Sequence, residues 1–333
     1  MNSITIEELM KLQPETITVL DVRPADEYRR GTFDGALSMP MKEIPGRKEE
    51  IPKDKPVYLL CHTGERSIIK KFRKPIWRKF TQAITDYDLV QPGDKIAVCI
   101  SGGKDSMLMA KLMQELQRHG KYPFELVFLV MNPGYNADNW KIIQDNAKVL
   151  GIPLTVFESE IFDIVAGVDR NPCYLCARMR RGNLYAEAKA LGCNKIALGH
   201  HFDDVVETIL MGMLYSGKIE TMMPKLHSKN FEGMELIRPM YKIKEEDIKA
   251  WRDYHKLHFI QCACRFTENC ATCGGERGSK RDEMKELMKQ FRATSDVIES
   301  NIFQSVHNIN LRTVIGYHKD DEVYNFLDDY NER

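Results

Sequence analysis

The sequence predicts an α/β protein in which a parallel sheet flanked by helices follows a smaller α/β unit. From residue 93 onward, short apolar runs alternate with longer segments of helical pattern, as in a parallel sheet with crossover helices. Before that point, the apolar runs Ile17–Leu20 and Val57–Leu60 each lead directly into a polar loop. Glycines and prolines between these two runs mark turns. The order of elements favours a Rossmann-like main domain.

The 333 residues are enough for two domains, one of them small. The composition, with 43% hydrophobic and 29% charged residues, is that of an ordinary globular protein. No apolar run approaches the roughly 18 residues of a membrane helix, and the first residues lack a signal-peptide pattern. We therefore expect a cytoplasmic protein with no membrane partner. We expect a small unit at 1–67, a basic helical linker at 68–90, the main domain at 91–315 and a peripheral tail at 316–333.

The linker is strongly basic, although the formal net charge of the chain is zero. Its apolar positions recur at a spacing of four, which predicts a helix. Pro75 is expected to kink this helix or to mark its true start. The basic residues of the linker, and a second group at Arg178, Arg180 and Arg181, form patches that could meet phosphates. A solvated helix face is the alternative. The apolar positions are Phe72, Ile76, Phe80 and Ile84, and the basic residues of 68–80 are Lys70, Lys71, Arg73, Lys74, Arg78 and Lys79.

The first strand of the main domain runs into the sequence Ser-Gly-Gly-Lys-Asp-Ser, and a helical pattern follows. Small residues let backbone amides approach an anion closely, a helix start adds partial positive charge, and Lys104 adds a full one. The loop is shorter than the Walker loop GxxxxGK[ST], so a common ATPase or GTPase is not indicated. We predict a phosphate site here, at the carboxyl end of a strand, where ligands bind in such folds. The predicted strands are Ile96–Ile100, Leu126–Val130, Leu154–Phe157, Lys195–Leu198 and Leu236–Ile237.

Two further motifs carry residues suited to metal or sulfur chemistry. Cys173 and Cys176 form a CxxC pair, and two thiolates at this spacing can hold one metal ion or cluster. The strand Lys195–Leu198 runs into a Gly-His-His-Phe-Asp-Asp block at 199–204. Six of the nine cysteines fall in two clusters, which in a reducing compartment points to metal binding or sulfur chemistry rather than to disulfides.

Together these motifs resemble those of the tRNA 2-thiocytidine synthetases, a family of PP-loop ATPases. SGGKDS, PCxxCxxxRR, ALGHHxDDxxxT, Met223-Pro224-Lys225 and Ile237-Arg238-Pro239 follow each other in the family's order over roughly residues 70–290. The resemblance implies a fold of the adenine nucleotide alpha-hydrolase type. It also implies an enzyme that adenylates O2 of the cytidine at tRNA position 32, in the anticodon loop, and replaces this oxygen with sulfur. The implied cofactors are ATP, Mg²⁺ and a [4Fe-4S] cluster, which three cysteines hold so that one iron stays open for sulfide.

The resemblance also assigns roles to individual residues. Asp105 would lie near Mg²⁺ or the cluster and is a candidate catalytic residue. Cys173 and Cys176 would be two of the cluster ligands. For His201, local hydrogen bonding is as good an interpretation as a catalytic role. The ATP phosphates would lie against the 101–106 loop, formed by Ser101, Gly102, Gly103, Lys104, Asp105 and Ser106, and the nucleotide and magnesium side would be shaped by Gly199, His200, Asp203 and Asp204.

The third cluster ligand is where this sequence departs from the family pattern. The family has one CxxC after an apolar strand, whereas here Cys262 and Cys264 are followed by Cys270 and Cys273. Matching the strand end selects Cys262, and matching the CxxCG with its downstream Lys280-Arg281 helix selects Cys270. We favour Cys262, because a strand end holds a ligand more rigidly than an inserted loop does. Cys264 and Cys270 remain alternatives, and the other cysteines could bind a separate zinc ion.

The first 67 residues resemble the opening of a rhodanese domain. Leu20–Tyr28 and Gly31–Ala36 match its start, and Cys61–Ser67 matches its CxxGxRS loop, in which the cysteine carries a persulfide. A cradle of backbone amides beside a helix start lowers the pKa of such a thiol. The remainder of a rhodanese domain is missing after Ser67, so the segment is a truncated one. We expect Cys61 to hand sulfur to the cluster, with a purely structural role as the alternative.

The sequence therefore predicts a tRNA sulfurtransferase that receives sulfur from a donor such as a cysteine desulfurase. A homodimer is expected because homodimers are common among relatives. One alternative is a related enzyme that forms 2-thiouridine in tRNA. A second is a zinc-stabilised RNA-binding protein without thiolation activity, and a third is a persulfide relay to a small molecule.

Overall fold

A computed structural model of the chain describes residues 12–22, 28–29, 32–40, 43–60, 67–166, 172–260 and 280–332. The chain folds into two compact units, Met1–Lys71 and Phe72–Arg333. Among the described residues, none of the helices is both long and apolar enough to cross a bilayer. Short helical turns of the 3-10 and π types lie at η1 (Pro14–Thr16), η2 (Lys48–Glu50), η3 (Ser67–Lys71), η4 (Arg73–Trp77), η5 (Leu311–Thr313) and η6 (Tyr330–Glu332).

The first unit contains a small parallel sheet. Strand β1 (Thr18–Asp21) lies between β2 (Leu37–Ser38) and β3 (Val57–Leu60), and both neighbours are parallel to it. The two predicted apolar runs thus form β1 and β3, and side chains of Ile17, Val19 and Ala36 make the core. Because β3 ends at Leu60, Cys61 follows the strand directly in sequence, but residues 61–66 lie outside the described residues.

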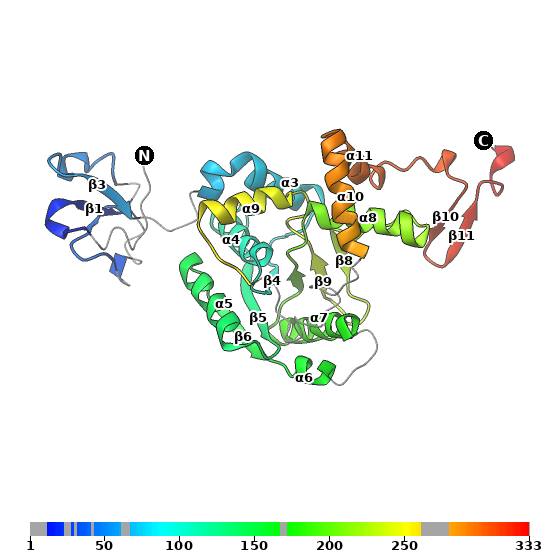
Figure 1. The fold of residues 1–333 in the computed structure, drawn as a ribbon, viewed down its shortest axis with the longest axis horizontal. Helices are drawn as coiled ribbons and strands as arrows, with labels where there is room; N and C mark the ends of the chain where they lie inside the picture. Colours follow the sequence, from blue (N-terminus) through cyan, green and yellow to red (C-terminus); the bar gives the residue numbers. More distant parts are fainter. Residues whose placement is uncertain are drawn as a thin grey trace. The chain divides into compact units, whose positions relative to one another are not determined.

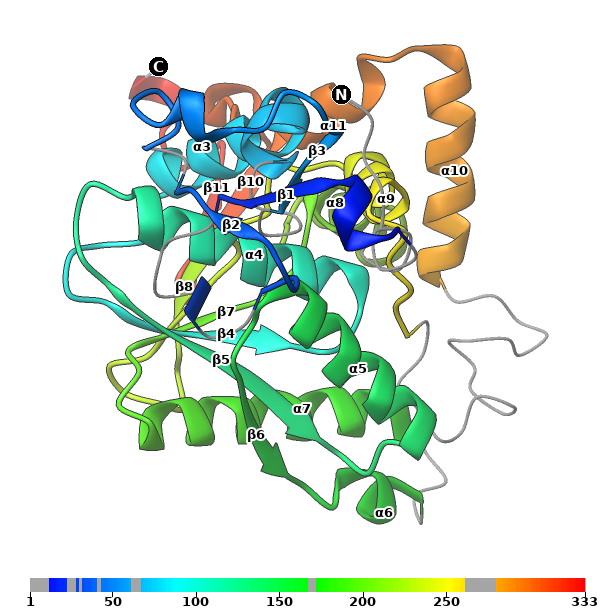
Figure 2. The ribbon, with the colours of Figure 1, turned by 90° about the vertical axis from the view of Figure 1, so that its left-hand side faces the viewer.

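The second unit is built on a six-stranded sheet with the order β6-β5-β4-β7-β9-β8 (Figures 1 and 2). Neighbouring strands are parallel except for the edge pair β8 and β9. All five predicted strands are confirmed. Strand β8 was missed because its three residues, Lys-Leu-His, carry only one apolar side chain. The strands are β4 (Lys95–Ile100), β5 (Glu125–Asn132), β6 (Leu154–Glu158), β7 (Lys195–Ala197), β8 (Lys225–His227) and β9 (Glu235–Ile237).

Helices cover both faces of this sheet, as the alternating pattern predicted (Figure 2). Helix α4 packs on one face of β4 and β5, and α7 packs on the other, where Tyr185 and Ala188 meet Ala97 and Leu129. The buried residues of β4 are therefore apolar on both faces. The helices are α4 (Lys104–His119), α5 (Ala137–Leu150), α6 (Ile161–Ala166), α7 (Pro172–Ala190), α8 (Phe202–Ser216), α9 (Glu245–Tyr254), α10 (Lys280–Thr294) and α11 (Ile298–Ser305).

The predicted linker helix starts with wide turns and becomes a regular α-helix, α3 (Arg78–Asp86), only after Pro75. The amides of Ile76 and Trp77 both donate to the carbonyl of Phe72, at 3.0 and 3.1 Å, so the turn around Pro75 is widened. A proline lacks the amide hydrogen and its ring clashes with the carbonyl four residues earlier, which a wide turn relieves. The apolar residues at a spacing of four are buried, as predicted.

The end of the chain, which we expected to be a peripheral tail, contains regular secondary structure. After α11, strands β10 (Gly316–Lys319) and β11 (Glu322–Asn325) form an antiparallel hairpin, in which the rings of Tyr317 and Tyr324 stack at 4.8 Å. This hairpin was not predicted, because its turn is Asp320-Asp321 and its strands lack a continuous apolar face.

Candidate active site

The two central strands, β4 and β7, pair in parallel and carry two of the predicted motifs at their carboxyl ends. The chain after β4 forms the loop 101–106 and enters α4, and the chain after β7 runs through 198–201 into α8. The strand order changes direction here, because β5 and β6 follow on one side and β9 and β8 on the other. In open α/β sheets such a switch point leaves a crevice for ligands. A Cβ atom at Gly199 would lie 3.2 Å from the backbone nitrogen of Ser106, so the two loops are in contact.

The loop 101–106 has the backbone of an anion cradle. Gly102 has a φ of +84°, and a Cβ atom there would lie only 2.6 Å from Cγ1 of Ile143 and 2.8 Å from Cδ1 of Ile260. The hydroxyl of Ser106 closes the loop, because it accepts from the amide of Ser101 at 3.1 Å and donates to the carbonyl of Gly103 at 3.0 Å. The N-cap residue of α4 is Gly103, which has no side chain with which to cap the helix. Its first amides and the positive end of the helix dipole therefore suit a phosphate.

Lys104 does not add a free positive charge to this cradle. Its Nζ lies 3.1 Å from Oδ1 of Asp105 and 3.0 Å from Oε1 of Glu245. Burial tends to lower the pKa of Lys104, but the two carboxylates outweigh burial and raise it. For Glu245, burial is likewise outweighed by Lys249 and Lys104, which lower its pKa to about 2. A direct contact of Lys104 with phosphate therefore remains a prediction, and Glu245 is a site residue that the sequence analysis missed.

His201 connects the two loops. Its Nε2 lies 3.8 Å from Oδ1 of Asp105 and 3.5 Å from Oδ2 of Asp204, and its Nδ1 lies 3.6 Å from Oδ2 of Asp203. Oδ1 of Asp105 is buried and accepts no hydrogen bond within the part of the chain that is described, although the Nζ of Lys104 is near it. A buried carboxylate oxygen of this kind suits a hard cation such as Mg²⁺.

The two aspartates of the block differ in what they can still bind. Both oxygens of Asp203 have protein partners: Oδ1 accepts from Arg292, and Oδ2 accepts from the backbone amide of Glu245 at 2.7 Å. Oδ2 of Asp204 accepts from the amide of His201 at 3.0 Å, but the side chain is still 19% exposed. Asp204 is therefore better placed than Asp203 to meet a ligand.

His200 is held neutral by its surroundings. Its Nδ1 lies 3.3 Å from Nε of Arg238, which donates to it. Burial, followed by the positive charge of Arg238, lowers the pKa of His200 to about 4. Burial also lowers the pKa of Arg238 to about 10. A neutral His200 near pH 7 can shape the site by hydrogen bonding, but it does not contribute charge to it.

The cysteine pair lies on α7, and the described part of that helix is close to the phosphate loop. Cys173 and Cys176 are three positions apart in the helix, the spacing that places two residues on one face. Cys176 is half-buried and packs beside Met131, near the carboxyl end of β5. From the loop after β5, the hydroxyl of Tyr135 donates to the carbonyl of Ser101 at 3.4 Å, so this edge of the sheet connects to the nucleotide loop.

A positive side chain, that of Arg180, also lies near the hydroxyl of Tyr135. Burial raises the pKa of Tyr135, while Arg180 on α7 acts to lower it and Cys176 to raise it, so both residues lie near its hydroxyl. Arg178 and Arg181 are exposed on the same helix. Tyr135 gave no sequence signal, because it directly follows Pro133-Gly134 in a loop and belongs to none of the predicted motifs.

The remaining cysteines divide into two groups. Cys99 and Cys193 are buried in the core between the sheet and α7, and burial raises the pKa of Cys99 to about 12. Residues 261–279 lie outside the described residues, and with them the favoured ligand Cys262 and the alternatives, Cys264 and Cys270. Among the described residues, no group of three or more His, Cys, Asp or Glu side chains is arranged to hold a metal ion.

The basic linker has its cations on one side. Phe72, Ile76 and Phe80 are buried, whereas the side chains on the other side of the same turns are exposed. The exposed basic residues are Lys71, Arg73, Lys74, Arg78 and Lys79. An exposed row of this kind suits contact with a phosphate backbone.

Gly102→Ala should abolish or strongly weaken nucleotide binding. The left-handed backbone would cost ~1–3 kcal/mol in a residue with a side chain, and the methyl group would also collide with Ile143 and Ile260. Gly93→Ala is the matched control, because Gly93 has a φ of +83° but nothing lies within 4 Å of its Cβ position. We expect both variants to lose stability in thermal unfolding and only Gly102→Ala to lose ATP affinity in calorimetry. Equal ATP affinities in the two variants would contradict the cradle.

Glu207→Gln should change the pH dependence of stability. Burial raises the pKa of Glu207 from 4.5 to about 7, although Arg281, whose Nε lies 3.1 Å from its Oε2, opposes the rise. The stability that this proton provides is present below pH 4.5 and is lost as the pH rises through about 7. The unfolding temperature of the variant, relative to the wild type, should therefore rise by several degrees between about pH 5 and about pH 8. Glu246→Gln, at an exposed site, should keep the wild-type profile.

Comparison with known proteins agrees with this geometry. A family profile described as a PP-loop domain matches residues 73–265, and one described as a rhodanese-like domain matches residues 5–88. The U34-tRNA thiolase NcsA from Methanococcus maripaludis, whose structure contains a [4Fe-4S] cluster, has the same fold, with a TM-score of 0.57 and 21% identity over 80% of this chain and 90% of that one.

Curated relatives are closer in sequence. The tRNA-cytidine(32) 2-sulfurtransferase of Alcanivorax borkumensis is 34% identical over 74% of this chain and 85% of its own length. The enzyme of that name from Neisseria meningitidis serogroup C is 32% identical over 77% of both chains. Relatives of this identity and coverage, together with the two motif loops at the switch point of the sheet, show that the chain belongs to the tRNA-cytidine(32) 2-sulfurtransferase family.

Proposed function

We propose that this protein uses ATP to activate O2 of a tRNA cytidine, at position 32 of the anticodon loop, and replaces that oxygen with sulfur. The observation that carries the proposal is the meeting of the 101–106 and 198–204 loops at the carboxyl edge of the sheet, in a chain of this family. A carbonyl oxygen is a poor leaving group. Attack of O2 on the α-phosphorus of ATP releases pyrophosphate, and the sulfur nucleophile then displaces AMP from C2.

In this proposal the two loops bind and orient ATP. Ser101, Gly102, Gly103 and Ser106 hold the phosphates by backbone amides and hydroxyls, and the start of α4 adds positive potential. Asp105 and Asp204 would hold Mg²⁺ together with the phosphates, because Asp105 has a buried oxygen that accepts no hydrogen bond from the described residues. Asp203, His200 and Gly199 fix the shape of the loop after β7.

The sulfur side is assigned to the cysteines. Cys173 and Cys176 on α7, with Cys262 as the favoured third ligand, would hold a [4Fe-4S] cluster, and thiolates are the ligands that such clusters prefer. The position of Cys176 supports this assignment. Cys176 lies near the hydroxyl of Tyr135, which donates to the carbonyl of Ser101 in the phosphate loop. When bound, such a cluster supplies an iron that can bind sulfur. Cys61, which follows β3, would receive sulfur from a donor such as a cysteine desulfurase.

The anticodon loop of the tRNA would enter the site, because its unpaired bases can leave the stack more easily than those of a duplex. The exposed cations of the linker and of α7 are the proposed phosphate contacts. We include a homodimer in the proposal, to be measured by light scattering.

Anaerobically purified protein should be brown, with a broad band near ~400 nm and about four irons per chain. Cys173→Ala and Cys176→Ala should lose the iron, and one of Cys262→Ala, Cys264→Ala and Cys270→Ala should lose it as well, which would identify the third ligand. Cys193→Ala, at a buried position in the core, should keep it. A colourless protein with one zinc ion, even after reconstitution with iron and sulfide, would favour the zinc-stabilised RNA-binding protein.

The product distinguishes the remaining alternatives. Incubated with ATP, Mg²⁺, sulfide and unmodified tRNA, the protein should release AMP and form 2-thiocytidine, measured by mass spectrometry of digested tRNA. Formation of 2-thiouridine would move the assignment to the related enzyme. Cys61→Ser should keep this activity with free sulfide and lose most of it when a cysteine desulfurase with cysteine is the donor. Equal activities with the desulfurase would make the first unit structural.

A further inference from the structure

Helix α10 presents two arginines to the acidic start of α8. Nε of Arg281 lies 3.1 Å from Oε2 of Glu207, and its NH1 lies 3.8 Å from Oδ1 of Asp204. Three helical turns further along α10, Arg292 donates to Asp203 and also to Glu299 of α11. Three acidic residues of one helix are thus held by two cations of another.

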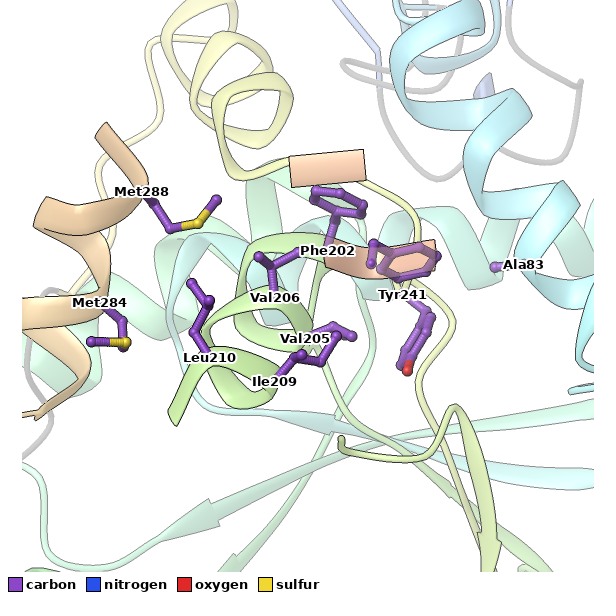
Figure 3. Packing of buried hydrophobic residues seen from close by; sticks show 10 residues of the cluster. Ala83, Phe202, Val205, Val206, Ile209, Leu210, Tyr241, Met284 and Met288 are labelled. Carbon is purple, nitrogen blue, oxygen red and sulfur yellow. The ribbon is translucent and has the colours of Figure 1, made fainter. Parts of the chain in front are cut away.

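The arginines belong to a single stripe of α10 that also contains its buried apolar residues. Positions 281, 284, 288 and 292 follow each other at spacings of three and four, so they share one face. Met284 and Met288, between the arginines, are each 3% exposed and pack with Val206 and Leu210 of α8 (Figure 3). The apolar contact in the middle fixes the distance between the helices, and the arginines at its two ends fix how α10 lies along α8.

The buried carboxylates that contact these arginines need positively charged partners. The side chains of Asp203 and Glu299 are 7% and 2% exposed. That of Glu207 is 5% exposed, and burial raises its pKa to about 7, so the argument from buried charge applies to Asp203 and Glu299. A charge buried to this extent is strongly destabilising without a counter-charge. Glu299 has a second cation, because Nζ of Lys244 lies 3.2 Å from its Oε2. Among the described residues, the cation that contacts Asp203 is Arg292, and Nδ1 of His201 lies 3.6 Å from Oδ2 of Asp203.

From Asp203 the contacts continue to the phosphate loop. Oδ2 of Asp203 accepts from the backbone amide of Glu245 at 2.7 Å, and this bond fixes the first turn of α9. The side chain of Glu245 then meets Lys104 at 3.0 Å, and Lys104 meets Asp105 at 3.1 Å. The first two contacts join α8 to α9 and α9 to α4, and the last lies within the first turn of α4. A displacement of Asp203 would therefore be passed on to the loop that holds the nucleotide.

We propose that Arg281 and Arg292 are positioning residues of the nucleotide site, which hold the acidic start of α8 and, through it, the loop that contains Asp105. This inference rests on the proposed function, because it assumes that ATP binds at the 101–106 loop. The proposal means that helices α10 and α11 contribute to ATP binding. Both helices follow the cysteine-rich segment in the chain.

The test is the affinity for α,β-methylene-ATP with Mg²⁺, measured by calorimetry well below the unfolding temperature. Arg292→Gln should weaken binding by about tenfold, or about 1.4 kcal/mol. Arg292→Lys should recover part of the loss, since an ammonium keeps the charge but cannot make both contacts of the guanidinium in the same geometry. If Arg292→Gln does not fold, Arg281→Gln, at a 41% exposed residue, carries the same test with a smaller expected effect.

Two controls separate positioning from loss of stability. Met288→Ala leaves a cavity in the same helix contact and should lower the unfolding temperature while keeping the wild-type affinity for the analogue. Lys289→Gln, on the exposed side of α10, should change neither. Wild-type affinity in the folded arginine variants, or an equal loss of affinity in Met288→Ala, would overturn the inference. Failure of the wild-type protein to bind the analogue would instead overturn the ATP site of the proposed function.

Discussion

The contact between the acidic start of α8 and the phosphate loop after β4 is the constraint on which the site depends. A closed series of contacts runs from Asp203 to the amide of Glu245, from Glu245 to Lys104, from Lys104 to Asp105 and back through His201. The members come from α8, α9 and the loop at the start of α4. A site built in this way keeps its geometry only while the surrounding helices keep theirs, as expected for a preorganised active site.

The charge balance of this site fits the proposal that a cation binds together with the substrate. Four acidic residues, at 105, 203, 204 and 207, lie near a loop that is proposed to bind a polyanion, and Lys104 is already shared between two carboxylates. The positive potential left for phosphate comes from the start of α4, from nearby arginines and from any Mg²⁺ that arrives with the nucleotide. His200 contributes none near pH 7, because burial and Arg238 lower its pKa to about 4.

The same edge of the sheet also places the sulfur side of the proposed chemistry. Cys176 packs at the end of β5, next to the loop from which Tyr135 contacts Ser101. Ile260 packs over Gly102, and Cys262 lies two residues further along the chain. Gly102, Cys176 and Ile260 therefore lie near one edge of the sheet, because parallel strands bring their carboxyl ends together there, although Gly102 and Ile260 are more than a hundred positions apart in the chain.

The sequence by itself determined the elements and the motifs: the five strands, the helix after the phosphate loop, the delayed start of α3 behind Pro75 and the chemistry of the 101–106 and 199–204 blocks. These follow from local periodicity, from proline and glycine geometry and from side-chain type. Only the tertiary structure decided which side chains meet. The charge of Lys104 is paired with carboxylates, and both oxygens of Asp203 have protein partners, whereas Asp204 remains partly exposed. Helix α10 contacts the acidic start of α8 through Arg281 and Arg292. Such pairs join residues up to 141 positions apart, here Lys104 and Glu245, and no local pattern records which charges meet once the chain has folded.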